Sequence, residues 1–172
     1  MEIKYLVLLR ENPIKNIVDL NFLTLPLSLD EVSQLELRYN NDYPFPIALK
    51  ELLYLAGSYC HVLNYGDYET QQELQEFVRG KLLKEHHPMP RPFFVIEICK
   101  ANFQFLFIYL DEGNNPPVYK AHYDSERLRL NQAPEVEHQS LSDLISSRIE
   151  RFKDEGNSFL RKVTPYDSTM AV

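Results

Sequence analysis

Hydrophobic residues recur with a helical period in the first half of the chain and with a strand-like pattern in the second half. In the first half, the apolar positions of 29–40 fall every three to four residues behind a Ser28–Glu31 capping box, which predicts an amphipathic helix. The proline-led segment 46–56 is apolar nearly all round and predicts a second, deeply buried helix. We expect Gly57 to end that helix in a left-handed conformation.

The same signals predict two further helices. Thr70 and Glu73 form a second capping box, and a helix is expected from there to about His86. Ser140 precedes the last helix, whose apolar positions recur as far as Phe152. The apolar stripe of the helix after Thr70 consists of Leu74, Phe77, Val78 and Leu82.

Three segments rich in β-branched and aromatic residues, 93–99, 103–110 and 118–123, predict strands. Their connections are short, so neighbouring strands should run antiparallel as a meander. The middle strand is apolar on both faces, which is typical of the centre of a sheet. The turn 113–115 should hold the positive φ values, and the Pro116–Pro117 pair should fix the start of the third strand because proline offers no ladder donor.

Helices followed by a meander and a final helix predict an α+β fold, in which an antiparallel β-meander sheet packs against several α-helices. We expect one domain over 28–160, preceded by the segment 1–27 and followed by a C-terminal tail, 161–172. The segment 1–27 is compatible with an extra strand or with irregular structure.

Composition limits the class of protein. The apolar runs are too short to span a bilayer, and the N-terminal residues lack the small-residue cleavage site of a signal peptide. We therefore expect a cytoplasmic protein without a membrane partner. Its two cysteines, Cys60 and Cys99, should be reduced, buried thiols.

The net charge of −7 arises from one stretch of the sequence. Between Asp30 and Glu76 there are nine acids and two bases, while the remainder of the chain is balanced. This distribution argues against nucleic-acid binding, because phosphates require a basic surface. It is compatible with a basic protein partner, and equally with helix surfaces whose acids serve only for solvation.

The residue types that carry chemistry form no catalytic or metal-binding pattern. Cys60 and His61 are adjacent, but neighbours in an extended segment point in opposite directions. The five histidines lack the spacing of metal ligands, and the five glycines form no phosphate-binding loop. Nothing in the sequence fixes Glu97 and Asp111 as a catalytic pair. We therefore expect no enzymatic activity, no metal and no cofactor.

Tyrosines and acids are interleaved between residues 39 and 68. Tyrosine combines a large contact area with a polar tip and anchors many protein interfaces. We expect the rings of Tyr39 and Tyr54 in the core, and those of Tyr65 and Tyr68 exposed on a loop. The sheet face around Lys120 and His122 is the alternative binding surface. The predicted partner-binding residues are Asp42, Tyr43, Tyr65, Asp67, Tyr68 and Glu69.

The order of these motifs resembles the SUKH superfamily of small α+β domains. The segment "YPFPIALKELLYLAG" (43–57) is similar to the family's proline-led helix that ends in glycine. The strand and turn 103–119, which end in "GNNPPVY", resemble its central strands, and "SLSDLISSRIERF" (140–152) is similar to its closing helix. Two features depart from the family: the chain has no tryptophan, and a plain "CKANF" replaces the usual Gly-Asp-rich hairpin.

The family includes yeast regulators of cell-wall glucan synthesis and many bacterial toxin-immunity proteins. The resemblance therefore implies a non-enzymatic protein-binding domain, most often an immunity protein that neutralises a cognate toxin. Together with the acidic stretch, it favours a basic toxin domain, such as a nuclease, as the partner. A housekeeping adaptor or regulatory domain of the same fold, without a toxin, is the alternative.

Overall fold

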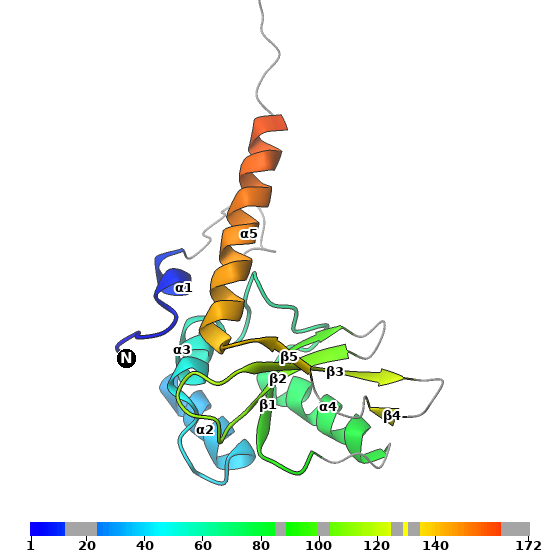
Figure 1. Ribbon diagram of the computed structural model, residues 1–172. Coiled ribbons are helices and arrows are strands. Elements are labelled where there is room, and N and C mark those ends of the chain that lie inside the picture. The colour runs from blue at the N-terminus through cyan, green and yellow to red at the C-terminus, as the bar shows by residue number, and fades with distance from the viewer. Residues whose placement is uncertain (13–23, 85–88, 100–103, 125–128, 131–134, 163–172) are drawn as a thin grey trace, which may run out of the picture.

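The computed structural model describes residues 1–12, 24–84, 89–99, 104–124, 129–130 and 135–162. These residues form an α+β fold in which an open antiparallel sheet packs against helices (Figure 1). The predicted fold class is confirmed. The connection 100–103, the histidines at 86 and 87 and the C-terminal tail from 163 onward lie outside the described residues.

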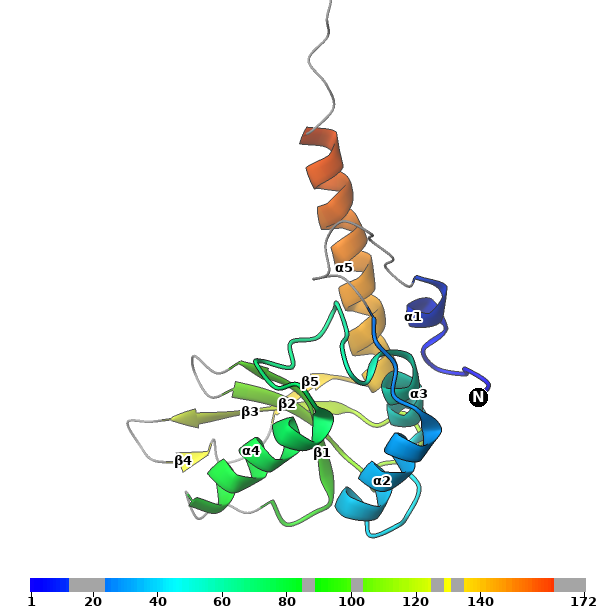
Figure 2. The same ribbon diagram turned by 180° about the vertical axis from the view of Figure 1, so that it is seen from behind.

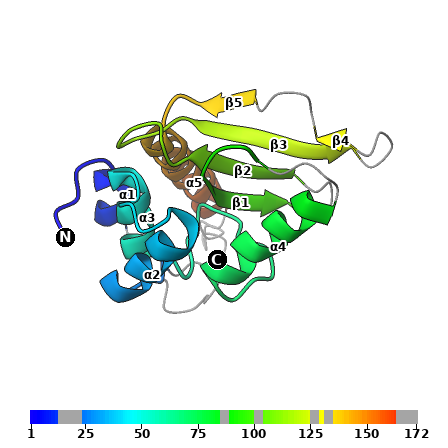
Figure 3. The ribbon, with the colours of Figure 1, turned by 90° about the horizontal axis from the view of Figure 1, so that it is seen from below.

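The predicted meander forms three neighbouring strands of the sheet (Figure 3). Strand β2 (Gln104–Tyr109) pairs antiparallel with β1 (Phe93–Cys99) on one side and with β3 (Val118–Asp124) on the other. Its residues 105–109 are all buried, as expected for a central strand apolar on both faces. Two short strands that the sequence did not predict, β4 (Arg129–Leu130) and β5 (Glu135–His138), pair with the other side of β3.

Helices α2 (Leu29–Tyr39) and α3 (Ile47–Ala56) form as predicted, and the Ser28–Glu31 capping box is present in full. The expected left-handed conformation of Gly57 is wrong, because its φ of −70° and ψ of −30° are right-handed helical. Glycine is required here because a side chain would not fit. A Cβ at this position would stand 2.7 Å from Cγ of Leu27, which packs across the end of the helix.

Helix α4 (Gln71–Lys84) begins at the predicted cap. The Thr70 hydroxyl accepts a hydrogen bond from the Glu73 amide at 3.1 Å, but the Glu73 carboxylate accepts from the Glu69 amide, one residue before the expected donor. The predicted stripe is correct for three of its four residues, whereas the side chain of Phe77 is 40% exposed. The helix face toward the sheet instead includes buried glutamines, of which Gln75 is fully buried.

The N-terminal segment contains a short helix, α1 (Val7–Glu11), and no strand in the described residues before it. This N-terminal segment is held in place by a carboxylate from the acidic stretch of the sequence. The Glu51 side chain of α3 is fully buried and accepts hydrogen bonds from the amides of residues 4–6, at 2.6 to 2.8 Å. These bonds bring Leu6 and Leu9 into the main core.

The connection between β2 and β3 caps two helices. The Asn114 carbonyl accepts a hydrogen bond from the Ala48 amide in the first turn of α3, at 2.9 Å. The Asn115 side chain bonds the amide and hydroxyl of Ser142, and the Pro116 carbonyl accepts from the Leu141 amide at 2.8 Å. Of the expected positive φ values in 113–115, only that of Gly113, at +85°, is present. The proline pair therefore holds a carbonyl in place for a helix amide as well as leading into β3.

Helix α5 (Leu141–Lys162) begins at Ser140, whose hydroxyl accepts from the Asp143 amide at 3.1 Å. Its first half packs on the domain through an apolar face, and its second half projects away from the sheet (Figures 1 and 2). The helix is longer than the predicted 140–152. The buried residues of that face are Leu141, Leu144, Ile145 and Ile149.

Candidate functional site

The structure places the six predicted partner-binding residues in two locations. Asp42 and Tyr43 lie in the turn between α2 and α3, and Tyr65 to Glu69 lie in the loop that leads into α4. The Tyr43 ring is 71% exposed. Asp42 has a φ of 65°, a left-handed conformation that aspartate tolerates better than most residues, so this position also has a structural reason to be acidic.

Tyr65 corrects the prediction of an exposed ring. Its side chain is 9% exposed, and its hydroxyl donates a 3.0 Å hydrogen bond to the Ala56 carbonyl at the end of α3. Burial raises the pKa of the Tyr65 hydroxyl well above its ordinary value. The following Gly66 has a φ of 72°, a conformation that glycine adopts readily. Tyr65 therefore supports the loop from within and does not present a surface to a partner.

The other three residues of the loop lie at the surface. Asp67 and Glu69 are exposed, and the half-buried Tyr68 packs its ring on that of Phe77, with 5.2 Å between centroids. This contact gives the exposed Phe77 of α4 a neighbour. The prediction that the rings of Tyr39 and Tyr54 lie in the core is partly correct, because both rings are half-buried and pack against the core.

A groove of about 550 Å³ runs between α2 and the start of α4. Its apolar lining comes from Leu27, Leu35 and Leu37, and the Leu37 side chain is 63% exposed. Glu31 and Glu69 stand on its lining, and hydrogen bonds from Ser28 hold the pKa of the Glu31 carboxyl below its ordinary value. The remaining lining residues are polar or basic: Gln34, Arg38, Ser58, Thr70, Gln71 and Gln72.

Side-chain contacts bridge the two helices that form the groove. The Arg38 guanidinium of α2 forms an ion pair at 2.9 Å with Glu76 of α4, an acid outside the groove lining. The Gln71 amide, nearly buried, donates to the Gly57 carbonyl at 2.8 Å and ties the start of α4 to the end of α3. These contacts tie the two walls of the groove to the rest of the fold, and its mixed lining combines leucines, two acids and neutral polar side chains with the paired Arg38.

Of the groove residues, the sequence predicted Glu69 as a binding residue but none of the leucines. Leu37 lies outside the apolar stripe of its helix, on the side expected to be polar. An apolar residue in that position is the one sequence signal that could have identified Leu37 as part of a binding surface. Leu27 could not be identified in this way because it lies outside any periodic segment.

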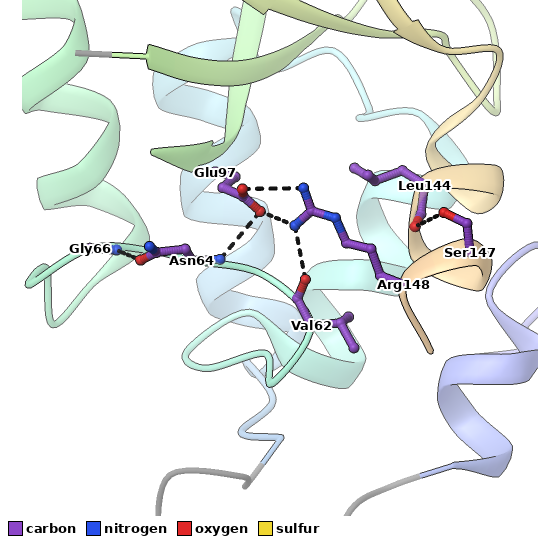
Figure 4. A network of polar contacts seen from close by, with 7 residues as sticks. All are labelled: Val62, Asn64, Gly66, Glu97, Leu144, Ser147 and Arg148. Atoms are coloured by element: carbon purple, nitrogen blue, oxygen red, sulfur yellow. Dashed lines mark hydrogen bonds and ion pairs between the residues drawn. The ribbon is translucent and has the colours of Figure 1, made fainter. Parts of the chain in front are cut away.

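The carboxylates near the sheet are held in ion pairs, of which Figure 4 shows the one between Glu97 and Arg148. Glu97 of β1 faces Arg148 of α5, whose guanidinium also donates to the Val62 carbonyl at 2.9 Å. The Asn64 amide donates to the same carboxylate at 3.3 Å. Asp111 is paired with Arg91 at 2.5 Å. Glu97 is thus paired with Arg148, and Asp111 shares Arg91 with Glu112, an arrangement that does not resemble a pair of catalytic acids.

The thiol and imidazole at residues 60 and 61 do not form a nucleophilic pair. Cys60 is fully buried, and this burial raises the pKa of its thiol to about 11, so the nucleophilic thiolate is disfavoured. His61 instead lies 3.1 Å from the Thr24 hydroxyl and packs its ring on Phe152. Cys99 is exposed, contrary to the prediction that both cysteines are buried, and both thiols are free.

The described part of the chain has neither a metal-binding cluster nor a membrane-spanning helix. Within it, no group of three or more histidines, cysteines and acids is arranged to hold a metal ion. Nor does any helix in these ranges combine the length and the apolar character needed to cross a membrane.

Comparison with known proteins gives no relative for this chain. No family model matches its sequence, no curated protein matches it, and no solved structure matches its fold. The resemblance to the SUKH superfamily therefore stays a prediction that rests on the motifs alone.

Proposed function

We propose that this chain is a non-enzymatic protein-binding domain, and that the groove between α2 and α4 binds a basic segment of a partner protein. The observation that carries the proposal is the groove itself, where an exposed leucine lies beside two acidic side chains. Such a lining suits an apolar anchor flanked by lysine or arginine, because the anchor fills the apolar part while opposite charges guide the encounter.

The surrounding charge supports the same type of partner. Exposed acids continue past the groove along the loop and the first turn of α4, at Asp67 and Glu73. The resemblance to immunity proteins adds a finer proposal, that the partner is a basic toxin domain which the chain neutralises inside the cell.

A peptide display library of random 14-residue sequences tests the groove. Peptides selected on the wild-type chain should contain a bulky apolar residue flanked by lysine or arginine. Leu37→Ser and Glu69→Lys should each weaken their binding about tenfold, since each removes one element of the recognition.

Two matched variants control for general surface effects. Leu83 is 68% exposed on α4 outside the groove lining, and Asp154 is an exposed acid on α5. Leu83→Ser and Asp154→Lys should leave peptide binding unchanged. Equal loss in the controls and in the groove variants would reject the groove as the binding site.

Co-expression with the product of the gene directly upstream tests the toxin proposal. If that product stops growth, the wild-type chain should restore it, and the Leu37→Ser, Glu69→Lys double variant should not. Peptide binding in the groove without any protection would favour an adaptor of the same fold over an immunity protein.

A further inference from the structure

The two edges of the sheet differ in how their main-chain groups are satisfied. Along β1, the Gln75 side chain of α4 bonds both the amide and the carbonyl of Val95, each at 2.9 Å. Arg79 donates to the Phe93 carbonyl at 2.5 Å, and the Ile98 amide donates to the Asn64 carbonyl at 2.9 Å. Helix α4 and the preceding loop therefore close this edge to any additional strand.

The opposite edge is formed by β5. One side of β5 pairs with β3, through the register Val118↔His138, Tyr119↔Val136 and Lys120↔Glu135, with an irregularity that leaves Glu137 without a partner residue on β3. On its other side, no strand or helix of the described ranges pairs with it. Residues 135–137 are exposed, and the Val136 side chain is 50% exposed. In Figure 3, β5 borders the sheet at the side remote from α4.

The side chains of β5 define what a strand beside it must carry. Glu135 lies opposite Lys120 and shares its face of the sheet, and Glu137 lies on that face too, 3.7 Å from the Lys120 ammonium. Val136 lies on the other face, opposite Tyr119. An incoming strand therefore meets two carboxylates on one face and an apolar side chain between them on the other.

We propose that β5 accepts a basic extended segment of a partner protein as an additional antiparallel strand. The segment would carry lysine or arginine at two positions separated by one apolar residue. Main-chain hydrogen bonds would supply affinity, and the alternation of basic and apolar side chains would supply the choice of partner. This surface is separate from the groove of the proposed function, because β1, β2 and β3 lie between β5 and α4.

A second copy of the chain is a poor occupant of this edge. Antiparallel pairing of two β5 strands about Val136 would set Glu135 opposite Glu137 of the second copy, twice. Like charges directly opposite across strands are destabilising. The same acids that favour a basic strand thus oppose self-association through β5.

Synthetic ten-residue peptides with a central Lys-Val-Lys or Glu-Val-Glu sequence test the proposal on the full chain. Amide hydrogen exchange, followed by NMR, should show slower exchange in β5 with the Lys-Val-Lys peptide and no change with the Glu-Val-Glu peptide. Glu135→Lys should weaken binding of the Lys-Val-Lys peptide at least tenfold. Glu69→Lys, in the groove, should leave the slower exchange of the β5 amides with the Lys-Val-Lys peptide unchanged.

N-methylation of the peptide backbone separates strand pairing from simple charge attraction. Methyl groups on the amides that face β5 should abolish binding, whereas methyl groups on the opposite edge of the peptide should preserve it. Equal binding of both methylated peptides, or protection of groove amides in place of β5, would overturn the proposal. So would dimerisation through β5 in sedimentation experiments without any peptide.

Discussion

Glu51 and Glu69 belong to the same acidic stretch of sequence, but they lie in opposite environments. Glu51 is fully buried in α3, where three main-chain amides donate to it, and Glu69 is exposed at the groove. The difference arises from residues 4–6, which are distant in sequence and supply the three donors. A count of acids therefore overstates the acidic surface, and the distinction between inward and outward side chains runs through the whole stretch from Asp30 to Glu76.

The largest expected effect follows from removal of the inward carboxylate. Glu51→Ala should lower the free energy of unfolding by about 3–5 kcal/mol, because it leaves three amides without an acceptor and a gap in the core. Urea denaturation measures this change. Glu69→Ala should stay within about 0.5 kcal/mol of wild type. Similar changes in the free energy of unfolding for the two variants would show that the buried and the exposed carboxylate contribute equally to stability.

A smaller loss is expected from the glutamine that closes the β1 edge. Gln75→Leu should cost about 2–3 kcal/mol, since it leaves the amide and the carbonyl of Val95 buried without partners. Gln72→Leu on the exposed side of the same helix is the matched control and should be nearly neutral. A stabilised Gln75→Leu variant would mean that packing outweighs these hydrogen bonds.

The two tyrosines at the ends of the candidate site should differ more modestly. Tyr65→Phe removes the hydrogen bond to the Ala56 carbonyl and should cost about 1 kcal/mol. Tyr43→Phe should leave the midpoint of denaturation unchanged, because its ring is exposed. The opposite ranking would show that Tyr65 does not support the loop.

The free energy of unfolding should depend weakly on pH because of His61. Burial lowers the pKa of its imidazole from an ordinary value of 6.5, so just below that pH the unfolded chain binds more protons than the folded one. Stability should therefore fall as the pH falls through this window. Denaturation at pH 7.5 and 5.5 measures the slope, and His61→Gln should reduce it. An unchanged slope would assign the pH dependence to other groups.

Local sequence signals predicted the fold well where the structure depends on neighbours in sequence. The capping box at Ser28 and the cap at Ser140 follow from residues within one turn, and the meander follows from the short connections between successive strands. The misses involve distant partners. Gly57 is required by the close approach of Leu27, and β5 forms only because β3 offers an edge.

The candidate site was harder to predict than the fold. Its acids were found by counting, but Tyr65 turned out to be buried and the groove depends on the way α2 lies beside α4. No local pattern encodes that arrangement. The helix bridge between Arg38 and Glu76 joins residues 38 positions apart, beyond the reach of periodicity.

The loop between β2 and β3 also has a consequence for the order of folding. Its carbonyl at Asn114 serves the first turn of α3, and its Asn115 side chain and Pro116 carbonyl serve the first turn of α5. Both helices thus depend on one loop that lies between them in sequence. When the loop makes these contacts, it joins residues that lie far apart in the sequence. The chain loses conformational entropy before these contacts stabilise the fold, and this loss slows folding. We therefore expect α3 and α5 to dock in one late step, with a single rate shared by probes on either helix.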